Sequence, residues 1–154
     1  RELCENLYTE LMESLADMGF KVCIALGGHA PADALLREIE AEKGGRIGDM
    51  LFYGGGTVDL LRGEIAQMAK EDPTLGGHGG MWESSLVMAV NPEWADLSRV
   101  EGVMDAPFPS QLQKMRPENL ARTQDANPEF GEKLIALAVD QAVSRAQALL
   151  AQTQ

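Results

Sequence analysis

The chain has 154 residues, of which 45% are hydrophobic and 24% charged, as is typical of one soluble globular domain with a core of its own. Its formal net charge of -11 argues against nucleic acid as a ligand, because phosphates are bound by Lys and Arg, and equally against an anionic membrane surface. The two cysteines, Cys4 and Cys23, show neither CxxC nor zinc-site spacing, which indicates free thiols in a reducing, cytoplasmic setting. The apolar runs are shorter than a membrane span requires, and no signal-peptide pattern opens the chain, so we expect no membrane association.

Helices and strands are predicted to alternate in the first half of the chain. Apolar residues recur at helical spacing over residues 1–18, and Gly19 ends this helix. The positions of this stripe are Leu3, Leu7, Leu11, Leu15 and Met18, with Tyr8 and Met12 alongside. The elements that follow are a buried strand at 20–26, a helix at 32–43, a strand at 47–53 and a helix at 58–70. This order favours an α/β fold, a three-layer sandwich with a mainly parallel sheet.

The second half is predicted to contain two helices around an irregular arm. A short helix covers residues 81–90 and is ended by Asn91-Pro92, and residues 93–127 are irregular and spaced by prolines. The last helix covers residues 129–151. Its predicted buried stripe is Ile135, Val139, Ala142, Val143, Ala146 and Leu150. We expect residues 1–154 to form a single α/β domain.

Both histidines of the chain directly follow Leu-Gly-Gly, in LGGHAP and LGGHGG. His29 comes at the end of the strand at 20–26, and ligands of open α/β sheets bind at the carboxyl ends of strands. We therefore expect His29 to be a metal ligand or an acid/base group, the alternative being a loop histidine that hydrogen-bonds locally. His78 has glycines on both sides, which fits a general acid/base or a substrate contact, or else a solvated histidine in a linker.

Glu83 stands at the start of the helix at 81–90, five residues after His78. It is either a metal ligand that points back to the His78 loop or a carboxylate that the helix dipole favours in a first turn. Trp82 is expected in the core or in a pocket wall. The GGGT segment at 54–57 precedes a helix and offers an anion site there, but it is neither a P-loop nor GxGxxG, so a nucleotide-binding domain is the least supported alternative.

Longer segments around both histidines resemble the creatininase (creatinine amidohydrolase) family. The stretch HGGMWESSLVMAVNPEWADLSRV, residues 78–100, resembles the family's C-terminal signature of His-Gly/Ala-Gly-x-x-Glu-Thr-Ser-Leu followed by Pro-Glu/Asp. The segment at 27–32 is similar to the family's Asn-Gly-His-Gly-Gly-Asn, and residues 127–143 are similar to its closing helix. The resemblance covers nearly the whole chain.

This resemblance implies a metal-dependent hydrolase of cyclic amides or related C–N bonds, with lactones and cyclic ketones as further substrates in the family. It implies two divalent ions, zinc, manganese or iron, which activate water. By the match, His29 would be a metal ligand, Glu83 a metal-binding carboxylate and His78 the acid/base group near the leaving group. Gly79 and Trp82 would border a small-molecule substrate. The family also implies a homo-oligomer, commonly a hexamer.

The sequence departs from the family pattern at several positions, and these departures suggest an alternative to the hydrolase function. The family takes further ligands from a Glu-x-His pair and an Asp near its N-terminus; this sequence contains no Glu-x-His, so we expect those ligands to come from a preceding segment or a separate chain. Pro31 and Thr74 stand where creatininase proper has a carboxylate and an aromatic substrate contact, which argues against creatinine as the substrate. The alternative is therefore a non-catalytic creatininase-like subunit or binding module without the metal site.

Overall fold

The computed structural model describes residues 1–57, 59–61, 67, 79–100 and 122–153, and the chain divides into two compact units. The N-terminal unit comprises Arg1–Leu61 together with Ala138–Gln154, and the central unit comprises Arg62–Leu137. Each unit is described by itself.

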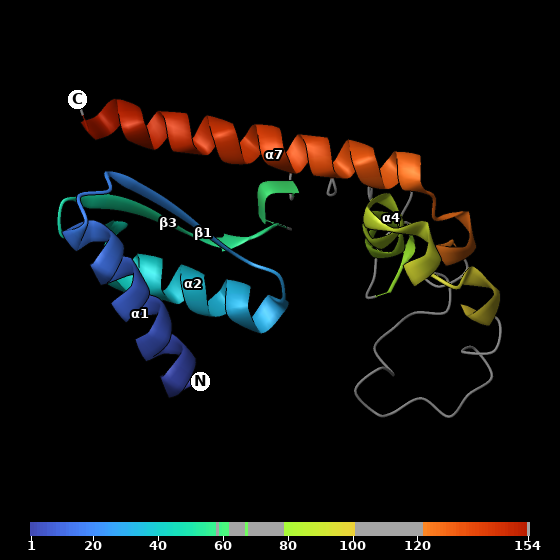
Figure 1. The fold of residues 1–154 in the computed structure, drawn as a ribbon, viewed down its shortest axis with the longest axis horizontal. Coiled ribbons are helices and arrows are strands. Elements are labelled where there is room, and N and C mark those ends of the chain that lie inside the picture. Colours follow the sequence, from blue (N-terminus) through green and yellow to red (C-terminus); the bar gives the residue numbers. More distant parts are fainter. Residues whose placement is uncertain (58, 62–66, 68–78, 101–121, 154) are drawn as a thin grey trace. The chain divides into compact units, whose positions relative to one another are not determined.

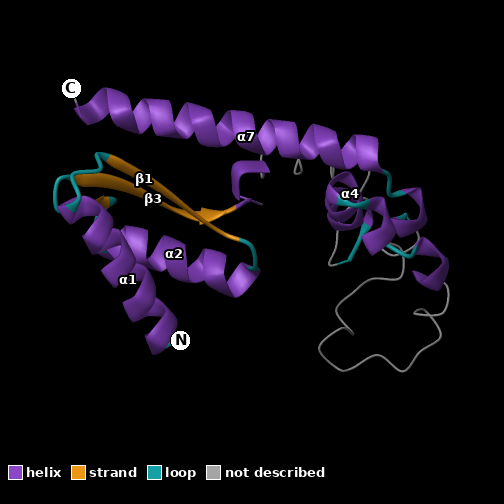
Figure 2. Ribbon diagram, viewed as in Figure 1, coloured by secondary structure: helices purple, strands orange, loops and turns teal. Residues whose placement is uncertain are grey.

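A small mixed sheet organises the N-terminal unit (Figures 1 and 2). Its elements are α1 (Glu2–Asp17), β1 (Val22–Gly27), α2 (Ala30–Glu42), β2 (Arg46–Ile47) and β3 (Met50–Gly56). The strand order is β1-β3-β2, with β1 parallel and β2 antiparallel to β3. The α/β class is thus confirmed. The sheet is mixed, with six parallel residue pairs between β1 and β3 and two antiparallel pairs between β2 and β3. The predicted strand at 47–53 is interrupted by a two-residue turn at Gly48 and Asp49, where Gly48 has a φ of 57° that suits a tight hairpin. The three-layer arrangement stays a prediction.

The core of this unit lies between the helices and the sheet. Its buried residues are Met12, Leu35, Leu36, Ile39, Ile47, Met50 and Phe52. Helix α2 approaches β3 closely at Gly54, where a Cβ atom would lie 2.2 Å from the backbone oxygen of Leu36.

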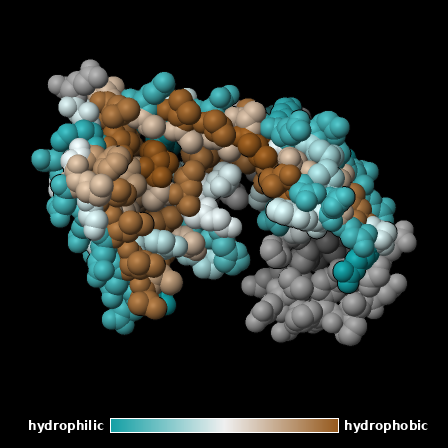
Figure 3. All heavy atoms as spheres, in the orientation of Figure 1, coloured by the Kyte–Doolittle hydropathy of each residue, from teal (hydrophilic) through white to brown (hydrophobic). Residues whose placement is uncertain are grey.

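Helix α1 forms as predicted, and it packs with only some of the apolar positions of the predicted pattern. Met12 is buried and Tyr8 and Leu15 pack beside it, whereas Leu3, Leu7 and Leu11 are exposed. Figure 3 shows hydrophobic residues on the surface of α1. Apolar residues occur on more than one side of this helix, so their period predicts the helix without selecting the side that packs on the sheet.

The central unit is built around α4 (Met81–Val90), whose bounds coincide with the prediction. Asn91 ends α4, and its side chain accepts a hydrogen bond from the N–H of Glu93 in a short 3-10 helix, Pro92–Trp94. Two further single turns, Leu97–Arg99 and Thr123–Asp125, belong to the predicted irregular arm, of which residues 101–121 lie outside the described residues. Most of the helix predicted at 58–70 also lies outside them, although residues 57, 59–61 and 67 are helical.

The long helix α7 (Pro128–Leu150) contributes to both units and continues into a 3-10 turn at Ala151–Thr153. Its buried positions are Gly131, Leu134 and Ala138. The predicted stripe is wrong at Ile135, Val139, Val143 and Leu150, which are 37–54% exposed, whereas Ala142 and Ala146 are half-buried. Figure 3 shows hydrophobic residues along the surface of α7. Leu134 and Ala138 each precede an exposed residue of this stripe, so the packed face is rotated by about one residue from the most apolar face.

By length and composition alone, Pro128–Thr153 would also qualify as a membrane span, with a mean hydropathy of 1.3 over its best 18 residues. This differs from the expectation that all apolar runs are too short. A core helix of a soluble protein passes the same test, but such a helix is mostly buried, whereas 11% of this window is buried. Asp140 and Arg145 lie within the apolar part of α7, and charged side chains are costly in a bilayer.

Candidate functional site

His29 occupies the position expected for a ligand-binding residue, after the carboxyl end of β1. Gly27 and Gly56 end the paired strands β1 and β3 side by side, and His29 is the N-cap residue of α2. Its backbone is extended, with φ -155° and ψ 138°, and its carbonyl oxygen accepts hydrogen bonds from the N–H groups of Ala32 and Asp33 at 2.8 and 3.0 Å. The imidazole makes no capping hydrogen bond and is exposed, so it is available to a ligand.

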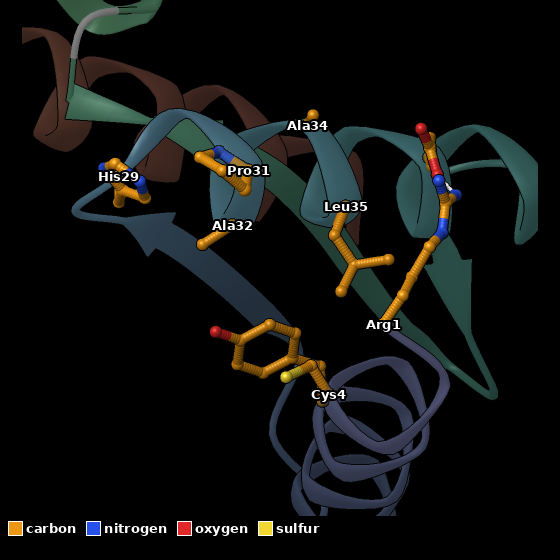
Figure 4. A pocket seen from close by; sticks show the side chains of 9 residues that line it. Arg1, Cys4, His29, Pro31, Ala32, Ala34 and Leu35 are labelled. Atoms are coloured by element: carbon orange, nitrogen blue, oxygen red, sulfur yellow. Dashed lines mark hydrogen bonds and ion pairs between the residues drawn. The ribbon is translucent and has the colours of Figure 1, made fainter. Parts of the chain in front are cut away.

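A pocket of about 510 Å³ lies beside His29, between α1 and the first turns of α2 (Figure 4). Figure 4 shows His29 at one end, Arg1 at the other, and Pro31 and Leu35 between them. Arg1 forms an ion pair with Glu38 there. The walls are mainly apolar, with the Tyr8 side chain and the imidazole as polar groups besides the Arg1–Glu38 ion pair, which suits the apolar part of a small molecule.

A buried carboxylate, Asp33, lies one helical turn after His29. Asp33 is 7% exposed, and its Oδ1 atom has no hydrogen-bond partner among the described residues. Burial and then the nearby Asp59 raise the pKa of the Asp33 carboxyl above its ordinary value. Arg37, the backbone N–H of His29 and the His29 imidazole lower this pKa to a smaller extent. Sequence reasoning missed Asp33, although its position four residues after His29 was a signal.

The amides of the GGGT segment are engaged by carboxylates. Asp59 accepts a hydrogen bond of 2.8 Å from the N–H of Gly56 and also forms an ion pair with Arg37. Glu40 accepts a hydrogen bond of 3.1 Å from the N–H of Gly54. Two of the donors that would bind a phosphate are therefore occupied, and the neighbouring charges would repel it, which argues against the nucleotide-binding alternative.

In the central unit, the peptide that follows His78 is held in a defined conformation. Gly79 has a φ of 69°, a left-handed conformation that glycine adopts without strain. Glu83 accepts a hydrogen bond of 2.5 Å from the N–H of Gly79. The hydroxyls of Ser84 and Thr123 donate to the carbonyl oxygen of Gly79 at 3.2 and 3.4 Å. Glu83 thus lies in the first turn of α4 and binds a free N–H group there, which is one of its two predicted roles, and its binding of metal stays a prediction.

The remaining predicted residues of this unit are less defined. Trp82 is half-buried in the first turn of α4, which agrees with a place in a wall, and its contact with substrate stays a prediction. His78 and Thr74 lie outside the described residues. Sequence reasoning did not anticipate Thr123, which belongs to the C-terminal part of the predicted irregular arm and donates its hydrogen bond to Gly79.

Within the described residues, no three His, Cys, Asp or Glu side chains come together as a group that would hold a metal ion. His29 belongs to the N-terminal unit and Glu83 to the central unit. Their assembly into one metal site with His78 stays a prediction.

Comparisons with curated proteins and with solved structures gave no match. The sequence model of the family described as creatininase, creatinine amidohydrolase, matches residues 1–146 of the 154. The match spans both histidine segments and most of α7. The chain therefore belongs to the creatininase family.

Proposed function

We propose that this chain acts in a metal-dependent hydrolase of a small cyclic amide, or of a related lactone or cyclic ketone. The observation that carries the proposal is the exposed imidazole of His29 at the carboxyl end of β1, beside an apolar pocket. Family membership supports an amidohydrolase with a divalent metal. The pocket volume of about 510 Å³ suits a small molecule.

The donors beside His29 fit a divalent cation. The His29 imidazole and the buried Oδ1 atom of Asp33, which has no hydrogen-bond partner within the part of the chain that the structure describes, are donor types that zinc, manganese and iron accept. When bound, such ions, two in the complete site by the family pattern, polarise a carbonyl group and lower the pKa of water. His29 would hold an ion through a ring nitrogen, and the apolar pocket walls would exclude bulk water from the substrate.

The central unit would contribute the proton transfer. In this proposal His78 gives a proton to the leaving nitrogen atom as the C–N bond breaks. The hydrogen bonds of Glu83 and Ser84 to Gly79 support this role, because they fix the peptide next to His78. Gly79 and Trp82 would border the substrate. Glu83 accepts the Gly79 N–H with Oε2, and its second oxygen would bind the metal.

We further propose that the working enzyme is a cytoplasmic homo-oligomer, with the family's hexamer as the expected size. The remaining metal ligands would come from a segment or chain that precedes Arg1 in the family pattern. The exposed leucines of α1, Leu3, Leu7 and Leu11, support an assembly, because water-exposed apolar stripes are unfavourable on an isolated protein.

The test is a measurement of metal content and turnover on one purified sample. The protein is loaded with zinc, manganese or iron and assayed against a five-membered cyclic imide, a six-membered cyclic amide, creatinine and a sugar lactone. We expect turnover of at least one substrate other than creatinine, and its loss with the bound metal in His29→Ala. Asp49→Asn, an exposed carboxylate in the turn between β2 and β3 and away from the carboxyl ends of β1 and β3, is the control. Unchanged metal content in His29→Ala contradicts the assignment, and a wild-type protein that binds no metal favours the non-catalytic alternative.

A further inference from the structure

The Asp33 carboxylate is placed at the same sheet edge as His29. It lies in the first turns of α2, and the glycines that end β1 and β3 enclose it. A Cβ atom at Gly27 would lie 2.3 Å from Oδ1 of Asp33, and one at Gly56 would lie 1.9 Å from Oδ2. Only glycine at both strand ends leaves room for this carboxylate.

A carboxylate at the start of a helix is by itself explained by the helix dipole, but that role does not account for the burial of Asp33. The backbone N–H of His29 stabilises the charged form of this carboxylate. Its Oδ1 atom, in contrast, is buried without a donor among the described residues. A buried carboxyl oxygen without a partner is costly, so a native structure normally supplies it with a cation or a donor.

The charged neighbours of Asp33 favour a cation as that partner. Arg37 is engaged with the Asp59 carboxylate in an ion pair. Asp59 adds negative charge beside the carboxyl end of β3, where it accepts the Gly56 amide. The Asp33 and Asp59 carboxylates thus share the Arg37 guanidinium as their neighbour, and a bound divalent cation would offset the remaining negative charge.

We propose that Asp33 binds the divalent cation together with His29, and so supplies from the first turns of α2 the carboxylate that Pro31 does not provide. This inference rests on the proposed function, since it assigns a further ligand to the same metal site. His29 and Asp33 provide two donors. The other coordination positions would be filled by water and by the further ligands that the family pattern implies.

The test is a titration of the metal-free full chain with Co²⁺, followed by the visible absorption of bound cobalt. Asp33→Asn keeps the size of the side chain and removes its charge. Gly56→Ala keeps Asp33 but adds a Cβ whose nearest neighbours are all atoms of the Asp33 carboxyl group. We expect either substitution to weaken Co²⁺ binding at least about 10-fold, since even the groups that support metal ligands contribute 10- to 100-fold. The double variant should lose no more than Asp33→Asn alone, because both act through one carboxylate.

Two controls separate this inference from the proposed function. Asp49→Asn removes an exposed carboxylate, and Gly28→Ala adds a Cβ beside His29 in open space, so both should bind Co²⁺ within about two-fold of the wild type. If His29→Ala loses Co²⁺ while Asp33→Asn and Gly56→Ala bind it normally, the metal site stands and the role of Asp33 is wrong. If the wild type binds no Co²⁺, the proposed function fails as well. Thermal unfolding of each variant checks the fold, and Gly56→Ala decides the matter if Asp33→Asn does not fold.

Discussion

Gly131 in α7 lies directly against the backbone carbonyl of Ser85 in α4, so that a Cβ atom at Gly131 would be 1.9 Å from that oxygen. The hydroxyl of Ser85 also accepts a hydrogen bond of 3.1 Å from the N–H of Asn127, just before α7. The two helices of the central unit therefore meet at backbone distance. This contact supports the helix whose first turn holds the peptide after His78.

Replacing Gly131 with Ala should destabilise the protein. In a free helix, Ala is more favourable than Gly by about 1 kcal/mol, whereas here the added methyl group must displace the backbone of α4. We expect the free energy of unfolding to fall by about 1–3 kcal/mol, the usual cost of overpacking. Urea unfolding followed by circular dichroism measures this. Gly28→Ala, with no atom within 4 Å of its Cβ, should cost less, and a stabilised Gly131→Ala protein would disprove the contact.

Ser85→Ala should destabilise the protein through a lost hydrogen bond. Ser85 is fully buried, and its removal leaves the N–H of Asn127 without the acceptor that it has in the structure. We expect a loss of about 1–3 kcal/mol in the free energy of unfolding. Ser144→Ala on the exposed side of α7 is the matched control, for which we expect a change of about 0.5 kcal/mol or less. Equal effects of the two substitutions would count against this bond.

The two cysteines should differ in their reactivity toward iodoacetamide. Cys4 is exposed, whereas Cys23 is half-buried in β1 and its pKa is raised above the ordinary 9.0 by burial. Because the thiolate is the reactive form, Cys23 should react more slowly than Cys4 at pH 8. Mass spectrometry of Cys4→Ser and Cys23→Ser measures each thiol alone. Faster alkylation of Cys23 than of Cys4 would contradict this placement.

The same burial of Cys23 should make stability fall at alkaline pH. With a raised pKa in the folded chain, the thiol loses its proton at lower pH in the unfolded chain than in the folded one. The unfolded state then binds fewer protons, so the free energy of unfolding decreases as pH rises through about 9.0 toward the folded value. Cys23→Ala should show a smaller decrease between pH 8 and 10 in urea unfolding. An identical pH dependence in the two proteins would rule out this contribution.

Arg145→Gln should weaken the attachment of α7 within the N-terminal unit. The guanidinium carbon of Arg145 lies 4.5 Å from the centre of the Tyr53 ring. A cation–π contact at a partly exposed site contributes about 0.5–1 kcal/mol, so we expect a loss of that size in the free energy of unfolding. Arg145→Lys keeps the charge and should lose less, and Arg99→Gln at an exposed position is the control. The contact is absent if Arg145→Gln and Arg99→Gln behave alike.

Local sequence patterns were sufficient for most of the elements and for the position of His29. The bounds of α4 follow from the Gly79-Gly80 turn before it and the Asn91-Pro92 pair after it, and both signals act on neighbouring backbone groups. His29 was predicted at the end of a strand because an apolar run is followed directly by two glycines. The same reasoning placed Glu83 in a first helical turn, where it accepts the Gly79 N–H.

Tertiary structure alone decided which faces are buried and which groups lack partners. The leucines of α1 and the predicted stripe of α7 have the right period, but burial depends on the surface that each helix meets, and that surface comes from distant residues. Likewise, the sequence displays Asp33 four residues after His29 without revealing its burial, which arises where Gly27 and Gly56 end adjacent strands. The sequence by itself therefore determined the helices, the strands and the strand-end histidine, because neighbouring residues control backbone conformation. Only the packing of distant segments decided that a buried carboxylate lies beside it, with one oxygen that has no hydrogen-bond partner among the described residues.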